Sequence, residues 1–210
     1  MTDTLVVQGS RAAKPQQILD AARQLFLKDG FGATSMDAIA KTAGVSKATV
    51  YARFSSKEDL FAAMMNAECG RTWPELSGSE LYNLDPLTKL REVAHRYVRF
   101  ITSPYTVSLL RVVASEATRT PELGRIFYEN APGLGRRRFA ELLQAADAKG
   151  ILRVSDPLRA ADHFFSLLRS DMHIRCLVGL PAPGEEELDD HAREVVEMFL
   201  RLYQPAPASA

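Results

Sequence analysis

The chain has 210 residues, and its 46% hydrophobic and 25% charged residues match an ordinary globular protein rather than a disordered one. Its 26 basic and 26 acidic residues balance, which argues against a protein that coats nucleic acid regardless of sequence. Two widely separated cysteines support neither a disulfide framework nor a metal site, and we expect no cofactor. Because neither a signal peptide nor a long apolar run is visible, we expect a cytoplasmic protein that does not enter membranes.

The first stretch of the chain combines a predicted flexible arm with one helix. Residues 1–13 have no apolar periodicity, whereas apolar residues recur at helical spacing from Ile18 onward. Pro15 suits the first position of this helix, and Gly30 suits its end. Residues 11–54 carry seven basic and three acidic side chains, and this charge of +4 indicates a polyanionic partner.

Two short helices and a tight turn follow, in the pattern of a helix-turn-helix. Thr34 or Ser35 can cap the first of these helices and Ser46 the second, because each offers a side-chain oxygen. Gly44 lies between them and can take the positive φ that a tight turn needs. The second helix is predicted over 47–54 and presents hydrogen-bond donors outward, as a helix in the major groove does: Lys47, Thr49, Tyr51 and Arg53.

The rest of the chain is also predicted to be helical, so the expected fold class is all-α with about nine helices. Further helices are expected over 86–103, 107–119, 122–149, 157–178 and 185–203, and the third of these should kink near Pro132. The expected domains are the arm over 1–13, a helix-turn-helix domain over 14–55, a connecting helix over 56–69, a regulatory and dimerisation domain over 70–204, and a disordered tail over 205–210.

A longer pattern runs through the first third of the chain, with Gly30-Phe31, Thr34-Ser35-Met36, Ile39-Ala40, Ala43-Gly44-Val45-Ser46-Lys47-Ala48-Thr49-Val50-Tyr51, Phe54 and Ser56-Lys57-Glu58-Asp59-Leu60. These positions, in this order, resemble the DNA-binding domain of TetR-family regulators. The resemblance implies base contacts from the start of the recognition helix and phosphate contacts from Thr34, Tyr51 and Lys57. The expected DNA-binding residues are Thr34, Ser46, Lys47, Ala48, Thr49, Tyr51, Arg53 and Lys57. Ala48 and Arg53 stand where the family most often has glycine and histidine, which leaves the operator sequence open.

The second half of the chain contains Leu109–Leu123, Phe127-Tyr128-Glu129 and Gly150-Ile151-Leu152 followed by Asp156-Pro157. These segments are similar to the AefR-like C-terminal domain of the same family, and the similarity implies a domain for dimerisation and ligand control. Apolar residues of the helix over 157–178 spread over about 200° of its circumference, which indicates packing against its own domain and a partner subunit. With the last helix it is expected to form a dimer interface through Phe164, Leu168, Asp171, Arg175, Val195 and Phe199. The alternative to a dimer interface is that residues of the same chain cover all the apolar side chains of the helix over 157–178.

A polar stripe on the same helix allows two interpretations. Polar residues recur at helical spacing from Asp162 to His173, and Asp171 and Arg175 lie four apart, where they can pair. The stripe either faces a ligand cavity or is a solvated surface beside a structural ion pair. A metal site from Asp162 and His173 lacks an evident third ligand. The ligand-binding residues expected under the first interpretation are Tyr97, Arg111, Phe127, Phe165, Arg169 and His173.

Together these features predict a transcriptional regulator that is not an enzyme, since the chain has neither a nucleophile elbow nor a phosphate-binding loop. As a homodimer it would place two recognition helices in successive major grooves of a palindromic double-stranded operator. A small-molecule effector would release this repressor from its operator. The alternatives are a transcriptional activator and a ligand carrier with a vestigial helix-turn-helix, while zero net charge disfavours a chromosome-binding protein indifferent to sequence.

Overall fold

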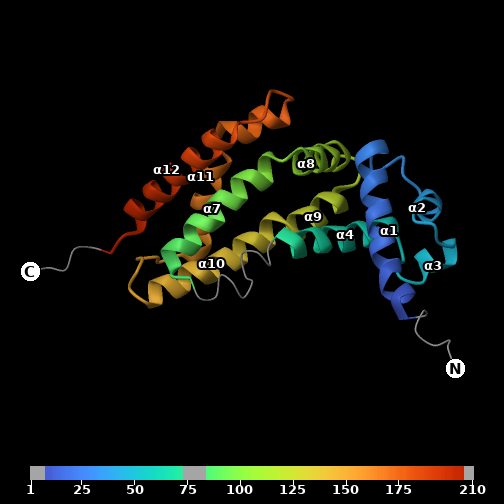
Figure 1. Ribbon diagram of the computed structural model, residues 1–210, viewed down its shortest axis with the longest axis horizontal. Helices are drawn as coiled ribbons and strands as arrows, with labels where there is room; N and C mark the ends of the chain where they lie inside the picture. Colours follow the sequence, from blue (N-terminus) through green and yellow to red (C-terminus); the bar gives the residue numbers. More distant parts are fainter. Residues whose placement is uncertain (1–7, 73–83, 206–210) are drawn as a thin grey trace, which may run out of the picture. The chain divides into compact units, whose positions relative to one another are not determined.

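The computed structural model describes residues 8–72 and 84–205, and all regular structure in these two ranges is helical. The helices, labelled as in Figure 1, are α1 (Gln8–Asp29), α2 (Met36–Thr42), α3 (Lys47–Tyr51), α4 (Lys57–Thr72), α7 (Pro86–Thr102), α8 (Pro104–Glu116), α9 (Pro121–Asn130), α10 (Pro132–Ala148), α11 (Pro157–Leu177) and α12 (Glu185–Tyr203). The predicted all-α fold class is therefore confirmed. Within the same ranges, none of the helices combines the length and the apolar character that a membrane crossing requires.

The helices form two compact units, each held together by its own contacts. The N-terminal unit contains α1 to α3, α4 up to Glu68, α9, and α8 from Leu109 onward. The C-terminal unit contains α7, the start of α8, and α10 to α12. The prediction placed one regulatory domain over 70–204, whereas in the structure residues 109–130 pack with the first four helices. This packing joins segments far apart in the chain, so the order of elements alone does not reveal it.

The short helices of the N-terminal unit begin at side-chain caps. The Ser35 hydroxyl oxygen accepts a hydrogen bond from the Ala38 N–H, and that of Ser46 accepts one from the Thr49 N–H. Each cap satisfies a backbone donor that the first turn of a helix leaves without an intrahelical partner. Gly44 has a φ of 65° between the two helices, as the tight turn was predicted to require.

An aromatic cluster forms the core of the N-terminal unit. The rings of Phe26, Phe31 and Phe61 are buried, with centroid separations of 5.2, 5.7 and 5.8 Å. Val50 and Phe54 are buried as well, so the second half of the segment that contains α3 is anchored in the core. Most core positions predicted from helical spacing are buried in this unit, such as Ile18 and Ile39, whereas Leu25, Ala43 and Val45 are half-buried.

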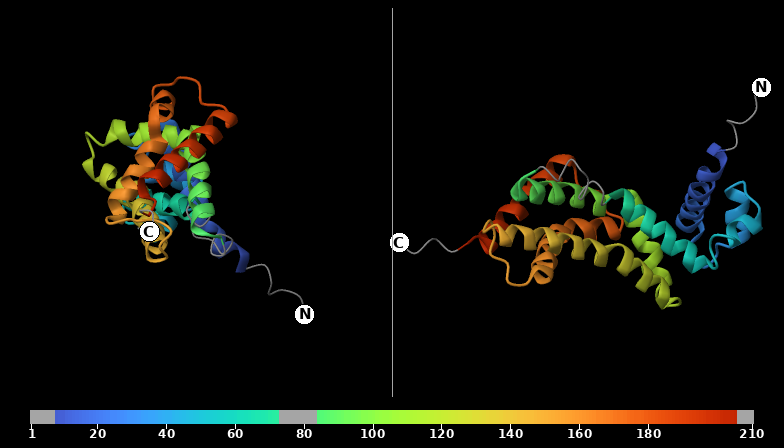
Figure 2. Two further views of the ribbon diagram at one scale, coloured as in Figure 1. Left: turned by 90° about the vertical axis from the view of Figure 1, so that its left-hand side faces the viewer. Right: turned by 90° about the horizontal axis from the view of Figure 1, so that it is seen from below.

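The C-terminal unit is a bundle centred on α11, which contacts α7, α10 and α12 (Figure 1; Figure 2). Asp85 and Asp156 cap α7 and α11, each directly before a proline at the first helical position. In the core, the Phe139 ring stacks on Phe164 with 4.5 Å between centroids and lies 5.0 Å from Phe165. These aromatic contacts hold the first half of α11 against α10.

The beginning of α1 differs from the prediction. The helix starts at Gln8, so residues 8–13 are helical rather than a flexible arm, and Pro15 lies inside the helix instead of at its first position. Proline was expected at the start because it cannot donate the hydrogen bond that an interior position requires. The predictions for residues 1–7, 73–83 and 206–210 lie outside the described residues.

Two local breaks shape the later helices. The predicted helix over 122–149 forms both α9 and α10, because Ala131 has a φ of −119° and a ψ of −88° directly before Pro132. Within α11, Ser170 has a φ of 36° and a ψ of −161°, in a region of backbone space that glycine adopts without strain and serine does not. Residues after Ser170 therefore do not continue the helical faces that precede it.

Candidate nucleic-acid interface and regulatory region

The recognition helix α3 has one buried side and a row of exposed residues. Val50 is fully buried, whereas Tyr51 is 46% exposed. The other predicted contact residues of this segment are exposed, apart from the half-buried Thr49: Ser46, Lys47, Ala48 and Arg53. The Ser46 and Thr49 hydroxyl oxygens lie 2.8 Å apart in a hydrogen bond, which fixes the start of the helix. This arrangement leaves donor groups at the surface, as readout of the major groove requires.

An acidic residue of α2 lies against α3, a contact that the sequence pattern did not predict. Asp37 Oδ1 is 2.8 Å from Lys47 Nζ, which also lies 5.8 Å from the centroid of the Tyr51 ring. The hydrogen bond to Asp37 and the charge of its carboxylate raise the pKa of Lys47 above its ordinary value. Because both side chains are more than half exposed, water or a phosphate can reach this ion pair.

Thr34 was predicted to contact phosphate, and the structure contradicts that prediction. Its side chain is only 4% exposed, and its hydroxyl donates to the Gly30 carbonyl at 2.7 Å. The hydroxyl therefore satisfies a carbonyl at the end of α1 and cannot reach DNA. Ser35, which caps α2, is the exposed hydroxyl at this point of the chain.

The Lys57 ammonium is held by carbonyl groups of the loop between α1 and α2. It donates to the backbone oxygens of Phe31 at 2.6 Å, Thr34 at 2.8 Å and Gly32 at 3.2 Å. It also lies 4.5 Å from the centroid of the Phe31 ring. A phosphate contact from this side chain would break these bonds, so the prediction needs revision. The backbone N–H groups at the N-terminus of α4 are better suited than the Lys57 side chain to donate hydrogen bonds to a DNA phosphate at this position.

In the C-terminal unit, four of the six predicted ligand residues lie around the break in α11. Tyr97 packs on Phe165 with 4.6 Å between ring centroids, and burial raises the pKa of its phenol. His173 is buried, with its Nδ1 at 3.1 Å from the Ile101 carbonyl oxygen. Burial lowers the pKa of His173, and the positive charge of Arg169 acts in the same direction. A neutral imidazole that donates from Nδ1 fits this environment.

The remaining two predicted ligand residues belong to the N-terminal unit. Arg111 on α8 is exposed and Phe127 on α9 is half-buried. Both lie in the segment 109–130, which packs with the first four helices. The six predicted residues therefore do not form one cluster within a single unit.

The ion pair predicted within α11, between Asp171 and Arg175, is replaced by a pair with a neighbouring helix. Arg175 forms an ion pair with Glu187 of α12 at 3.1 Å rather than with Asp171. Asp162 forms one with Arg136 of α10 at 2.6 Å. Asp162 thus ties α11 to α10 and Arg175 ties it to α12, which favours the structural interpretation for these two residues.

Four of the six residues predicted at the dimer interface are buried inside the chain itself. Phe164, Leu168, Val195 and Phe199 are at most 1% exposed, so they leave no surface for a partner subunit and the prediction is wrong for them. Asp171 is exposed and Arg175 half-buried. Around this core, α11, the turn after it and α12 carry a set of exposed apolar side chains: Leu167, Ile174, Val178, Leu180, Met198 and Leu202.

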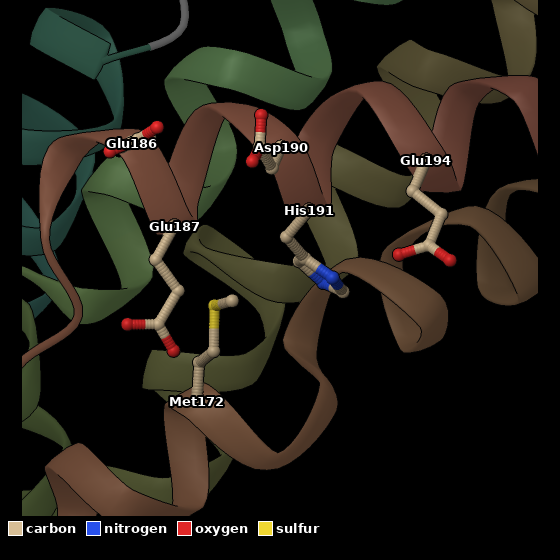
Figure 3. A pocket seen from close by; sticks show the side chains of 6 residues that line it. All are labelled: Met172, Glu186, Glu187, Asp190, His191 and Glu194. Atoms are coloured by element: carbon tan, nitrogen blue, oxygen red, sulfur yellow. The ribbon is translucent and has the colours of Figure 1, made fainter.

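A surface groove of about 460 Å³ lies between α11 and α12 (Figure 3). It is lined by Met172, Glu186, Glu187, Asp190, His191 and Glu194. The Met172 side chain points from α11 toward α12, and His191 Nε2 lies 3.2 Å from the Leu168 carbonyl oxygen. The four carboxylates make the lining acidic, which suits cationic groups rather than an apolar effector.

Two capped helices joined by a positive-φ glycine, with exposed donors on the second, define a DNA-binding protein of the helix-turn-helix class. Bacterial regulatory proteins of the tetR family match residues 18–64, and the C-terminal domain of AefR-like transcriptional repressors matches residues 88–205. The chain therefore belongs to the TetR family, as a DNA-binding transcriptional regulator with an AefR-like C-terminal domain.

Three transcriptional regulators support this assignment, and their similarity extends over different fractions of the chain. The solved structure of the flavonoid-responsive regulator FrrA is 40% identical, covers 93% of this chain and 100% of its own, and superposes with a TM-score of 0.78. A helix-turn-helix transcriptional regulator of Mycobacterium tuberculosis is 29% identical over 100% of this chain and 94% of its own. The regulator AcrR of Shigella flexneri is 39% identical over 79 residues, which are 37% of each protein.

Proposed function

We propose that this protein represses transcription as a homodimer on a palindromic operator, and that a flat aromatic effector of the flavonoid class releases it. The observation that carries the DNA-binding part is the exposed face of α3, where Lys47 and Tyr51 stand at the surface above the buried Val50. A short capped helix with this arrangement fits the major groove, and two copies fit a palindrome with half-sites about one helical turn apart.

The proposed effector class rests on two observations. FrrA, whose name describes it as flavonoid-responsive, is 40% identical to this chain over nearly its whole length. The C-terminal unit also gathers aromatic rings, since Phe165 lies between Tyr97 at 4.6 Å and Phe139 at 5.0 Å. Aromatic side chains beside a cation such as Arg169 suit a flat ligand that carries phenol groups.

The proposed dimer interface is the outward apolar face of α11 and α12. Leu167 is 37% exposed on α11, and Met198 and Leu202 are 41% and 64% exposed one turn apart on α12. An apolar set of this kind on adjacent helices is typical of a surface that a partner covers. The two helices of each copy would then form a four-helix contact around a two-fold axis.

Operator binding and release are tested with duplexes that the purified protein enriches from a random library. Binding of the enriched duplex is followed by fluorescence anisotropy while flavone, flavanone or isoflavone is added. We expect enrichment of a palindrome and its release by at least one flavonoid. A palindrome that stays bound at saturating concentrations of all three would contradict the effector class. A reporter gene behind the enriched site should rise when the regulator is deleted, and a fall would make it an activator.

The interface is tested by sedimentation of Leu167→Glu, which places a charge on the proposed contact. Leu158→Glu is the matched control, because Leu158 is 41% exposed on the same helix but lies half a turn around its circumference from Leu167. We expect the first variant to sediment as a monomer and the second as a dimer. Dimers of both variants at equal stability would contradict this interface.

A further inference from the structure

The loop over 30–34, between α1 and α2, is held from two sides. Gly30 ends α1 with a φ of 82°, and the loop leads directly to Ser35, the cap of α2. On one side, three carbonyls of the loop accept hydrogen bonds from the Lys57 ammonium, at 2.6 to 3.2 Å. Lys57 is the first residue of α4, so the beginning of α4 fixes the path of the chain into α2.

On the other side, a carboxylate packs against the loop glycines. A Cβ atom added at Gly32 would lie 3.1 Å from one carboxylate oxygen of Glu116 and 3.4 Å from the other. At Gly30 the corresponding distance to Glu116 is 3.8 Å. Glu116 is the last residue of α8, so the end of α8 rests on the same loop that Lys57 holds.

Both helices that supply these contacts extend across a division between the two units. The division between the N-terminal and C-terminal units falls after Glu68 within α4 and after Ser108 within α8. A shift of either helix along its axis must therefore move Lys57 or Glu116 against the loop. Because α2 starts at the end of this loop and packs on α3, displacement of the loop changes the setting of the recognition helix.

We propose that Lys57 and Glu116 are positioning residues for operator binding, and that the loop over 30–34 is where changes in α4 and α8 reach the helix-turn-helix. The regulatory half of this inference rests on the proposed function, in which an effector shifts the C-terminal unit. The positioning half concerns contacts within the N-terminal unit and is tested without an effector. Both side chains act through α2 and touch no base themselves.

The test is a double-mutant cycle between Gly32 and Glu116, measured as affinity for the duplex that the wild-type protein enriches. Gly32→Val introduces a branched side chain where even one added carbon meets the Glu116 carboxylate at 3.1 Å. Glu116→Ala removes that carboxylate, and the double variant has room for the valine. Gly184→Val is the matched control, because no atom lies within 4 Å of a Cβ added at Gly184. Thermal unfolding of every variant is recorded beside its affinity.

We expect Gly32→Val to weaken operator binding about tenfold, and Glu116→Ala in that background to restore most of the loss. Because Glu116→Ala relieves the clash in the fold as well, thermal unfolding separates the two effects: positioning requires that Gly32→Val stay fully folded at the temperature of the binding assay. The inference would be overturned if the two substitutions changed operator affinity independently of each other, or if Gly32→Val did not change it. In either case the proposed operator binding itself would stand. If the wild-type protein enriched no duplex, the proposed function itself would fail, and this inference with it.

Discussion

The ion pair between Asp37 and Lys47 makes DNA affinity sensitive to a substitution outside the recognition helix. Asp37→Asn removes a carboxylate oxygen 2.8 Å from the Lys47 ammonium and leaves that cation available to a phosphate. Each additional neutralised phosphate steepens the dependence of log affinity on log salt by about 0.9. Between 50 and 200 mM salt, the variant should therefore lose about 3.5-fold more affinity than the wild type loses, starting from tighter binding at low salt.

The assay is fluorescence anisotropy of the enriched duplex at a series of salt concentrations between these limits. Asp190→Asn provides the same change of net charge in the C-terminal unit, where Asp190 pairs with Arg193 at 2.5 Å. We expect the control to keep the wild-type slope. An unchanged slope in Asp37→Asn, or equal slopes in the two variants, would refute the reasoning that Lys47 exchanges Asp37 for phosphate.

Three further substitutions test the local structure by urea unfolding. Ser170→Gly should raise the free energy of unfolding by about 1 kcal/mol, because glycine adopts the φ of 36° without strain, and no gain over Ser170→Ala would contradict the break in α11. Thr34→Val should lower the free energy of unfolding by about 1 kcal/mol through the lost bond to Gly30, and an unchanged free energy of unfolding would contradict that bond. His173 has a folded-state pKa below its ordinary 6.5, so folding favours the neutral imidazole and stability falls as pH drops through 6.5. His173→Gln should lose less stability than the wild type between pH 7.5 and pH 5.5, and an equal loss would contradict a buried neutral imidazole.

Local rules of helix capping predicted much of the N-terminal unit. Ser35 and Ser46 each bond to a backbone N–H three residues ahead, and Gly44 takes the positive φ of the turn. These features depend on residues within one turn of each other, which is the range over which a sequence pattern is informative. The donors predicted to face outward from the recognition helix are exposed, apart from the half-buried Thr49, whereas Val50 is buried.

The errors arose where contacts join segments far apart in the chain. Nothing in the pattern around Lys57 indicates that its ammonium turns back to carbonyls more than twenty residues earlier. The faces of α11 were extrapolated at constant helical spacing, and the strained backbone at Ser170 interrupts that spacing. The sequence pattern shows that Phe164 and Leu168 are apolar and must be covered, but it does not show by what. They were predicted at a dimer contact, whereas α11 packs against α7, α10 and α12 of the same chain and both residues are buried there.

Hydroxyl-radical footprinting of the enriched duplex shows whether the exposed face of α3 reads an operator. The wild-type protein should protect two symmetric half-sites about one helical turn apart. Tyr51→Ala should lose this protection at concentrations that saturate the wild type, because the Tyr51 side chain is 46% exposed on that face. A footprint that Tyr51→Ala and Lys47→Ala both retain unchanged, or a single asymmetric footprint, would contradict the account.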